Sequence, residues 1–241
     1  MKEKKYIKNN ILYMNMSGVY ADRTPREDFL DLPGTNGYCD KEAEETIRQR
    51  LKPYPHEGIH FLDSGNYHYL SYFWLEKINC DFSLVLMDHH PDMQKPAFGD
   101  ILSCGGWVAN AMEDLCHLKE VYLVDVDRAL VEELKVLPVN VIYKTKAEAK
   151  NGDFGRFPLY LSIDKDVLSE DVVMTDWDQG DMTKEELLEI LDNMAKNPLL
   201  GVDICGEIKE NGNDKMQEDQ REINRCILGS FCDRMTPEVM F

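Results

Sequence analysis

The chain lacks an apolar run of about 18 residues, the length that a membrane-spanning helix needs, so the sequence predicts no transmembrane segment. Its opening residues, Met1-Lys2-Glu3-Lys4-Lys5, lack the apolar core of a signal peptide. The 7 cysteines are odd in number and scattered, and no two are spaced as Cys-x-x-Cys, which is typical of reduced thiols. We therefore expect a cytoplasmic protein without a membrane partner.

Positive charge is also scarce. The 27 Lys and Arg residues are outnumbered by 45 Asp and Glu residues, which gives a formal net charge of −18. This negative charge argues against nucleic acid as a partner and favours a cationic substrate or peptide. Solubility is the simpler explanation of the charge, because helix-like segments such as residues 184–193 carry much of it on faces expected to be solvated.

The sequence shows no internal repeat, low-complexity tract or linker, so we expect a single domain over residues 1–241. Its 43% hydrophobic content suffices for one large core. Apolar runs alternate with helix-like segments, a pattern that predicts an α/β fold of three layers (αβα) with a mainly parallel central sheet. The expected strands are residues 11–20, 59–62, 83–87, 121–124, 140–143, 160–163 and 199–204, and the expected helices are residues 41–51, 69–78, 106–115, 183–195 and 219–228.

The run Asp88-His89-His90-Pro91-Asp92 follows an apolar segment, residues 83–87, that is typical of a buried strand. Asp88, His90 and Asp92 stand at alternate positions, and alternate side chains of an extended chain point to one side. Two carboxylates and an imidazole are therefore expected to converge beyond the carboxyl end of a strand, where open α/β sheets place their sites. His89, between them, is expected to point away.

A second strand-like run, residues 159–163, leads into Asp164-Lys165-Asp166, which again places carboxylates at alternate positions. Crowded carboxylates repel one another, and a cation relieves the repulsion. Four carboxylates and an imidazole favour two divalent ions over one. This donor set favours Mn²⁺, then Fe²⁺ or Zn²⁺, and disfavours soft metals because no cysteine takes part.

His68 is the expected sixth ligand, because it follows a strand-like segment and a Gly-containing turn and opens a helix-like stretch. A histidine at this place can reach the same rim of the sheet. Three other candidates have simpler explanations. His60 lies inside an apolar strand and is expected to be a core residue, while Asp125 and Asp127 follow an apolar run and are expected to form a surface turn.

These motifs resemble those of the arginase and agmatinase family, the ureohydrolases, which carry Asp-x-His-x-Asp and Ser-x-Asp-x-Asp at strand ends and a further His upstream. The resemblance covers residues 59–207 and rests on six ligands that agree in type and order. The segments Asp-His-His-Pro-Asp and Ser-Cys-Gly-Gly-Trp look closer to a divergent arginase-like branch that includes peptide arginases. The resemblance implies an arginase-like fold with two bound ions. The implied ligands are His68, Asp88, Asp92 and Asp164 for one ion, and Asp88, His90, Asp164 and Asp166 for the other.

The expected chemistry is metal-assisted hydrolysis. A water shared by two ions loses a proton near neutral pH and attacks an sp² carbon, such as that of a guanidinium group. Asp92 is expected to be catalytic as well as a ligand, because its carboxylate can accept a hydrogen bond from the hydroxide. Arginases carry a His soon after Asp-x-His-x-Asp that is regarded as a proton shuttle, and residues 102–107 of this chain contain none.

The expected substrate is a cationic guanidino compound, either a small molecule or an arginine-containing peptide. Asp176 and Asp178 flank Trp177 in a loop after the second carboxylate pair, and together they can hold a cation by charge and by cation–π contact. A capped turn before the next helix is the alternative explanation of this loop. Ser103 and Cys104 are further candidate substrate contacts, with a structural Gly turn as the alternative.

Glu207 is a candidate catalytic residue by resemblance, since arginases bind the guanidinium group with a Glu after the corresponding strand. Gly206 stands at the position of that Glu, so Glu207 needs a one-residue bulge to reach the site. Two other functions stay open: a metal-dependent amide hydrolase or deacetylase on the same fold, which uses one Zn²⁺ and fewer acidic ligands, and a non-catalytic metal-binding protein. Homo-oligomer formation is also left open.

Overall fold

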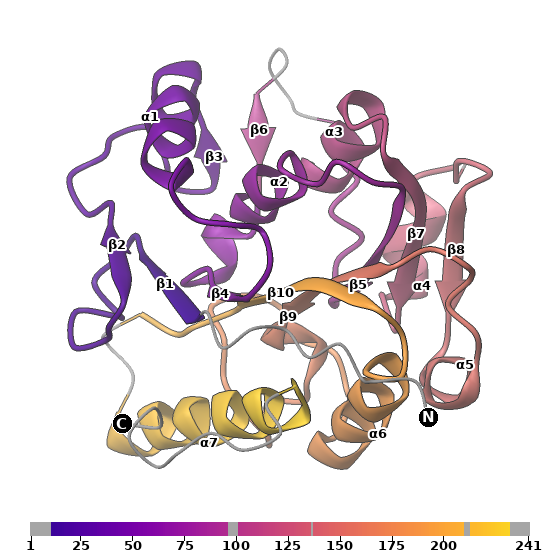
Figure 1. Ribbon diagram of the computed structural model, residues 1–241. Helices are drawn as coiled ribbons and strands as arrows, with labels where there is room; N and C mark the ends of the chain where they lie inside the picture. Colours follow the sequence, from indigo (N-terminus) through magenta and orange to yellow (C-terminus); the bar gives the residue numbers. More distant parts are fainter. Residues whose placement is uncertain (1–10, 96–100, 136, 210–212, 232–241) are drawn as a thin grey trace.

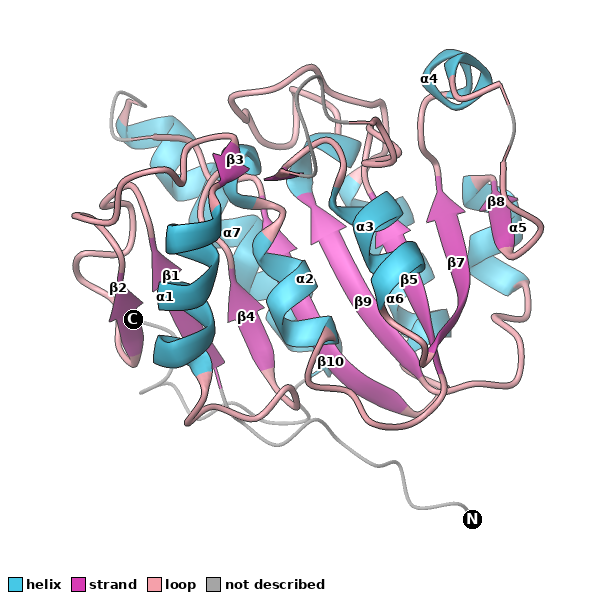
Figure 2. Cartoon of the chain, turned by 90° about the horizontal axis from the view of Figure 1, so that it is seen from above, coloured by secondary structure: helices cyan, strands magenta, loops and turns pink. Residues whose placement is uncertain are grey.

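Eight parallel strands form the central sheet, in the order β2-β1-β4-β10-β9-β5-β7-β8 (Figure 2). The computed structural model describes residues 11–95, 101–135, 137–209 and 213–231. In sheet order the strands are Arg26–Asp28, Ile11–Asn15, Ile59–Phe61, Leu199–Cys205, Leu159–Asp164, Phe82–Met87, Leu118–Val124 and Val141–Lys144. Two further strands, β3 (Tyr38–Cys39) and β6 (Leu102–Ser103), pair antiparallel with each other.

Helices cover both faces of the sheet, as Figures 1 and 2 show. One face carries α1 (Lys41–Leu51), α2 (Leu70–Leu75) and α3 (Trp107–Asp114). The other carries α5 (Lys146–Asn151), α6 (Lys184–Met194) and α7 (Asp214–Phe231). Each face has its own hydrophobic core, and the two cores are separated by the sheet. The predicted three-layer α/β architecture with a parallel sheet is therefore confirmed.

The central strands consist mostly of apolar residues, as expected for strands that helices cover on both faces. β5 and β9 are buried at every position. Two of the helices begin directly after a residue whose side chain caps the helix N-terminus. The side chain of Asp40 accepts a hydrogen bond from the backbone of α1, and Thr183 forms a capping box with Glu186 at the start of α6. The predicted bounds of these elements accordingly agree with the structure to within about two residues.

Several short elements were not predicted, and one strand is shorter than expected. The strand predicted for residues 11–20 ends at Asn15, because the chain turns through Gly18, which has a φ of 105°. The polar edge strand β2 and the short helices α4 (Arg128–Glu133) and α5 lack the periodic apolar pattern that reveals longer elements. Among the residues that the structure describes, none of the helices combines the length and the apolar character that crossing a membrane requires.

Candidate metal centre

The register of the sheet brings the two carboxylate motifs together. β5 and β9 are neighbours, and Met87 lies opposite Ile163. The next residues, Asp88 and Asp164, therefore leave the sheet side by side at its carboxyl edge. Parallel strands end at the same edge, which is where open α/β folds build their sites.

All six predicted metal ligands converge at this edge. Two clusters share Asp88, the first with His68 and Asp92 and the second with His90 and Asp166, and Asp164 is grouped with His68. In the first cluster, Nδ1 of His68 lies 3.1 Å from Asp88 and 3.0 Å from Asp92. In the second, Nδ1 of His90 lies 3.5 Å from Asp88 and 2.9 Å from Asp166. Asp164 joins the first cluster, with Oδ2 3.5 Å from Nδ1 of His68.

The side chains of Asp88, His90 and Asp92 do not converge in the way we expected from the sequence. Residues 88–90 form a bend beyond the strand, and Asp92 adopts a left-handed φ of 49°. A turn therefore directs these side chains to one place, because the segment is not extended. Its backbone is tied to the cluster, since the N–H of His89 donates to Asp166 and the N–H of His90 donates to Asp88.

His68 is oriented by a partner on the far side of its ring. Nε2 lies 2.8 Å from Oγ of Ser162, and that hydroxyl also lies 3.0 Å from Oγ of Ser71. The hydrogen bond at Nε2 leaves Nδ1 directed at the carboxylates of the cluster. Metal-ligating histidines are commonly fixed in this manner by a partner of the second ring nitrogen.

The pKa values show how strongly these groups interact. Burial opposes the charged form of His68, but hydrogen bonds with Asp88 and Asp92 prevail and raise the pKa of the imidazole well above its usual 6.5. Burial also opposes the charge of His90, yet Asp166 and Asp88 raise its pKa to about 11. The carboxylates around both imidazoles thus favour positive charge at this place.

The pKa values of two carboxylates in the cluster are raised as well. Burial and the charge of Asp166 raise the pKa of Asp164 to about 6. Burial and the charge of Asp88 raise the pKa of Asp166 to about 6 as well. Four buried carboxylates exceed the two positive charges that His68 and His90 can supply. The donor set therefore fits a pair of divalent cations, which offer the missing charge and accept every oxygen and nitrogen ligand present.

The cluster lies at the base of a cavity of about 660 Å³. Ser103 and Cys104, the candidate substrate contacts, line this cavity. Trp177 lines it too, with its ring 5.7 Å from that of His90. Asp176 and Asp178 are both exposed and do not line the cavity. The loop thus presents its tryptophan and not its acids to the cluster.

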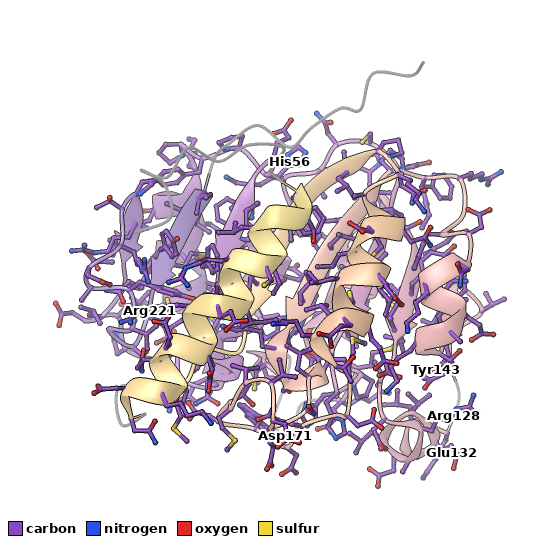
Figure 3. The ribbon with its side chains drawn as sticks, turned by 90° about the horizontal axis from the view of Figure 1, so that it is seen from below. His56, Arg128, Glu132, Tyr143, Asp171 and Arg221 are labelled. Atoms are coloured by element: carbon purple, nitrogen blue, oxygen red, sulfur yellow. The ribbon has the colours of Figure 1, made fainter. Side chains whose placement is uncertain are left out.

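Glu207 also lies outside this cavity. Gly206 has a φ of 87°, which breaks the alternation of the strand, and the side chain of Glu207 reaches the opposite side. There it pairs with buried Lys165 at 2.8 Å and lines a separate cavity of about 310 Å³. Arg221 of α7, which is labelled in Figure 3, lines the same cavity. The bulge that would bring Glu207 to the metal cluster is therefore not present.

Three residues near the cluster were missed by the sequence analysis. Trp107 donates a hydrogen bond to Asp92, Cys205 lies beside Asp164, and Lys95 lines the cavity. The sequence around Trp107 and Cys205 contains no motif that indicates a metal site. Only the folded structure shows that these two residues lie near the cluster. The N–H of Trp107 matters because it fixes a carboxylate that also contacts His68.

The residues set aside earlier behave as expected. His60 is buried and stacked on Trp74 with 3.8 Å between ring centroids, while its Nδ1 lies 2.9 Å from Asp203. Asp127 caps α4, and Asp125 lies in a positive-φ turn 3.6 Å from Lys146. These contacts are structural.

A comparison with known sequences gives one informative relative. No protein-family model matches the chain. A protein of Thermotoga maritima that is described as uncharacterized is 38% identical over 177 residues, which are 73% of this chain and 68% of that protein. The chain belongs to the same family as this Thermotoga maritima protein.

Solved structures identify the architecture. Proclavaminate amidino hydrolase from Streptomyces clavuligerus matches with a TM-score of 0.66 and 13% identity over 99% of this chain and 92% of its own. The chain has the arginase-like ureohydrolase fold. A Mn²⁺-bound triple mutant of a T. brucei arginase-like protein has the same fold, with a TM-score of 0.60 and 15% identity over 96% of this chain and 93% of its own.

A third structure shows the same arginase-like fold in a longer protein. A hypothetical agmatinase from Burkholderia thailandensis matches with a TM-score of 0.55 and 20% identity over 76% of this chain. The matched part is 61% of the agmatinase, so this chain spans about three fifths of that protein.

Proposed function

We propose that this protein is a binuclear-metal-dependent hydrolase of C–N bonds, of the ureohydrolase type, that acts on a guanidino group of a small molecule or of peptidyl arginine. One observation carries the proposal. Oδ2 of Asp88 lies 3.1 Å from Nδ1 of His68, and Oδ1 of Asp88 lies 3.5 Å from Nδ1 of His90. A buried carboxylate that serves two ligand clusters at once is suited to two cations side by side.

The donor set suggests which ions and which ligands. His68 and Asp92 would hold one ion, His90 and Asp166 would hold the other, and Asp88 and Asp164 would contribute to both. Carboxylate oxygens dominate both sets, which favours Mn²⁺, with Fe²⁺ or Zn²⁺ as alternatives. The T. brucei protein of the same fold is bound with Mn²⁺. Two divalent ions held by these residues would supply Lewis acidity, which lowers the pKa of water toward neutrality.

Asp92 is the residue that we assign to orient the attacking water. Its Oδ2 accepts a 2.6 Å hydrogen bond from Nε1 of Trp107 and lies 3.0 Å from Nδ1 of His68. These contacts fix the plane of the carboxylate and leave Oδ1 to accept a hydrogen bond from water. Asp92 is only 5% exposed, so competing bulk water is largely excluded from this oxygen.

The outer cavity suggests how the remainder of a substrate is bound. Lys95 is a cation on the cavity wall, and Tyr38 and Trp177 provide partly exposed aromatic rings there. A guanidino compound with an apolar body and a neutral or anionic distal end is complementary to this wall. The role of Asp176 and Asp178 as cation contacts is not part of the proposal, because both are exposed and neither lines the cavity.

A metal-dependent amide hydrolase on the same fold is the second candidate, and one observation favours it. Within the described part of the chain, the cavity wall carries no carboxylate beyond the four aspartates of the cluster. A guanidinium group therefore lacks a dedicated negative partner, whereas a neutral amide needs none.

Product analysis distinguishes these functions. The purified protein is loaded with Mn²⁺ and offered guanidino compounds, arginine-containing peptides, amidines and amides, and the release of urea, ammonia and free carboxylate is measured. Urea release that is lost in Asp88→Asn supports the proposal. Carboxylate release from amides alone supports the second candidate. Two bound ions with no release from any compound would contradict both and indicate a non-catalytic metal-binding protein.

A further inference from the structure

A buried thiol lies beside the carboxylates of the cluster. Cys205 is the last residue of β10 and is fully buried. β10 pairs with β9 in parallel register, and Cys205 lies opposite Asp164. Residues opposite each other in a sheet direct their side chains to the same face, so the thiol and the carboxylate are neighbours.

The thiol also lies close to the imidazole of the first cluster. The sulfur of Cys205, a ring nitrogen of His68 and a carboxylate oxygen of Asp164 all lie within 4.8 Å of one another. With metal–sulfur bonds of about 2.3 Å, metal–nitrogen bonds of about 2.0 Å and tetrahedral angles, two ligand atoms of one ion lie about 3.5 Å apart. Side-chain rotations that close the present separations by up to about 1.3 Å would let the three groups coordinate the same ion.

The end of β10 is shaped so that residue 205, and not the next one, offers a side chain here. A Cβ atom at Gly206 would lie 2.5 Å from Oδ1 of Asp164. Glycine at that position lets Asp164 occupy the space and keeps it next to the thiol. The S–H of Cys205, a weak donor, contacts the carbonyl oxygens of Ser64 at 3.3 Å and Asp63 at 3.7 Å. Breaking such S–H contacts costs little.

We propose that Cys205 supplies a sulfur ligand to the ion on the His68 side of the cluster, so that this position selects a thiophilic ion such as Zn²⁺, Fe²⁺ or Co²⁺. The His90 side keeps an oxygen-rich set that suits Mn²⁺. The ion displaces the thiol proton, which leaves to solvent. This inference rests on the two-ion site of the proposed function and replaces our expectation from the sequence that no cysteine takes part.

Cobalt spectroscopy tests the proposal without an activity assay. The metal-free full-length protein is titrated with Co²⁺, and near-ultraviolet absorption is recorded for a thiolate-to-cobalt charge-transfer band. We compare the unaltered protein with Cys205→Ser and with two control variants. Cys39→Ser removes a buried cysteine outside the cluster, and Cys104→Ser removes a cysteine of the cavity wall. Elemental analysis counts the bound ions in each sample.

We expect a band in the unaltered protein and in both controls, and its loss in Cys205→Ser with cobalt still bound. The affinity for Zn²⁺ should fall on the order of tenfold more than the affinity for Mn²⁺ in that variant. A band that persists in Cys205→Ser, or that disappears only in Cys104→Ser, overturns the proposal.

X-ray absorption on the Zn²⁺-loaded, unaltered protein provides a test that does not depend on folding of a variant. A sulfur shell at about 2.3 Å from zinc supports the proposal, and a shell of only nitrogen and oxygen overturns it. If two ions bind without a sulfur signal, the ligand role of Cys205 fails and the proposed function stands. If fewer than two ions bind at saturating metal, the proposed function fails as well.

Discussion

The indole Nε1 of Trp107 donates a 2.6 Å hydrogen bond to Oδ2 of Asp92. The backbone N–H of Val108 donates to the carbonyl oxygen of Asp92 at 3.0 Å. The first turn of α3 therefore holds Asp92 at both its side chain and its backbone, which stabilises its left-handed φ of 49°. Arginases carry the shuttle His in the region where this chain has Ser-Cys-Gly-Gly-Trp. Here, the tryptophan that ends the segment positions a predicted metal ligand.

Trp107→Phe tests this positioning. The substitution keeps most of the ring and removes only the hydrogen-bond donor to Asp92. We expect metal affinity to fall by about 10- to 100-fold, the usual cost of losing a partner of a metal ligand, measured by competition with a chelating dye. Trp74→Phe is the matched control, because Nε1 of buried Trp74 has no hydrogen-bond partner within the described residues. Equal losses of affinity in the two variants would show that Trp107 acts through packing alone.

Asp88→Asn tests the sharing of one carboxylate by two ions. Asp88 belongs to both ligand clusters, whereas Asp166 belongs to one. We expect elemental analysis to find fewer than one tightly bound ion per chain in Asp88→Asn and about one in Asp166→Asn. Two tightly bound ions in Asp88→Asn, or in the corresponding Asp164→Asn variant, would refute the ligand assignment.

The sequence predicts those ligands whose local motif directly follows a strand of the parallel sheet. The two carboxylate motifs follow apolar runs that become β5 and β9, and parallel strands place the residues after them at one edge. His68 could be predicted as a metal ligand only because five other candidate ligands had already been found. The chain order of these motifs therefore suggested the cluster, although the turn that directs Asp92 into it was not foreseen.

The positions that sequence reasoning misplaced depend on single backbone angles and on long-range register. The positive φ of Gly206 directs Glu207 away from the metal cluster. No local sequence pattern predicts on which side of the sheet the chain continues after this glycine. Cys205 lies beside Asp164 because β10 and β9 pair in one particular register. Asp176 and Asp178 were grouped with Trp177 by sequence distance, whereas the folded loop presents only the ring to the cavity.

The stability of the metal-free protein should depend on pH in a defined direction. The pKa values of Asp164 and Asp166 are raised from 3.8 to about 6 in the folded protein, chiefly by burial. A group whose pKa is raised by folding contributes stability that is complete at low pH and is lost as the pH rises through the folded value. We therefore expect the melting temperature of the metal-free protein to fall between about pH 4 and pH 7 on account of these groups.

Divalent ions bind the ionised carboxylates, so the rise in melting temperature on adding Mn²⁺ should be larger at about pH 7.5 than at about pH 5. Asp125→Asn is the control, because burial raises the pKa of Asp125 to about 6 but this residue lies outside the cluster. That variant should keep the full metal response. A metal response that is the same at both pH values would show that the cluster is less crowded than its geometry implies.

Lys95 is expected to select for the distal end of the substrate. Three guanidino probes share a four-carbon chain and end in a carboxylate, a methyl group or an ammonium group. Binding to the Mn²⁺-loaded protein should be tightest for the carboxylate and weakest for the ammonium, with a preference of about two- to fivefold per step, because Lys95 is exposed. In Lys95→Met the order should collapse while metal content stays constant. An unchanged order in the variant would remove Lys95 from substrate recognition.

Glu207→Gln is expected to alter stability and not substrate binding. Nζ of Lys165 is fully buried and lies 2.8 Å from Oε1 of Glu207, which also accepts hydrogen bonds from Tyr20 and Asn224. Removing one partner of a buried ion pair costs about 3 to 5 kcal/mol, which lowers the melting temperature by roughly 10 °C in a protein of this size. The double variant Lys165→Met/Glu207→Leu should recover much of this loss, because it leaves no unpaired buried charge. Metal content and KM should be unchanged in Glu207→Gln. A normal melting temperature with a raised KM for a guanidino substrate would instead show that Glu207 binds the guanidinium group, and that the ion pair with Lys165 gives way when substrate is bound.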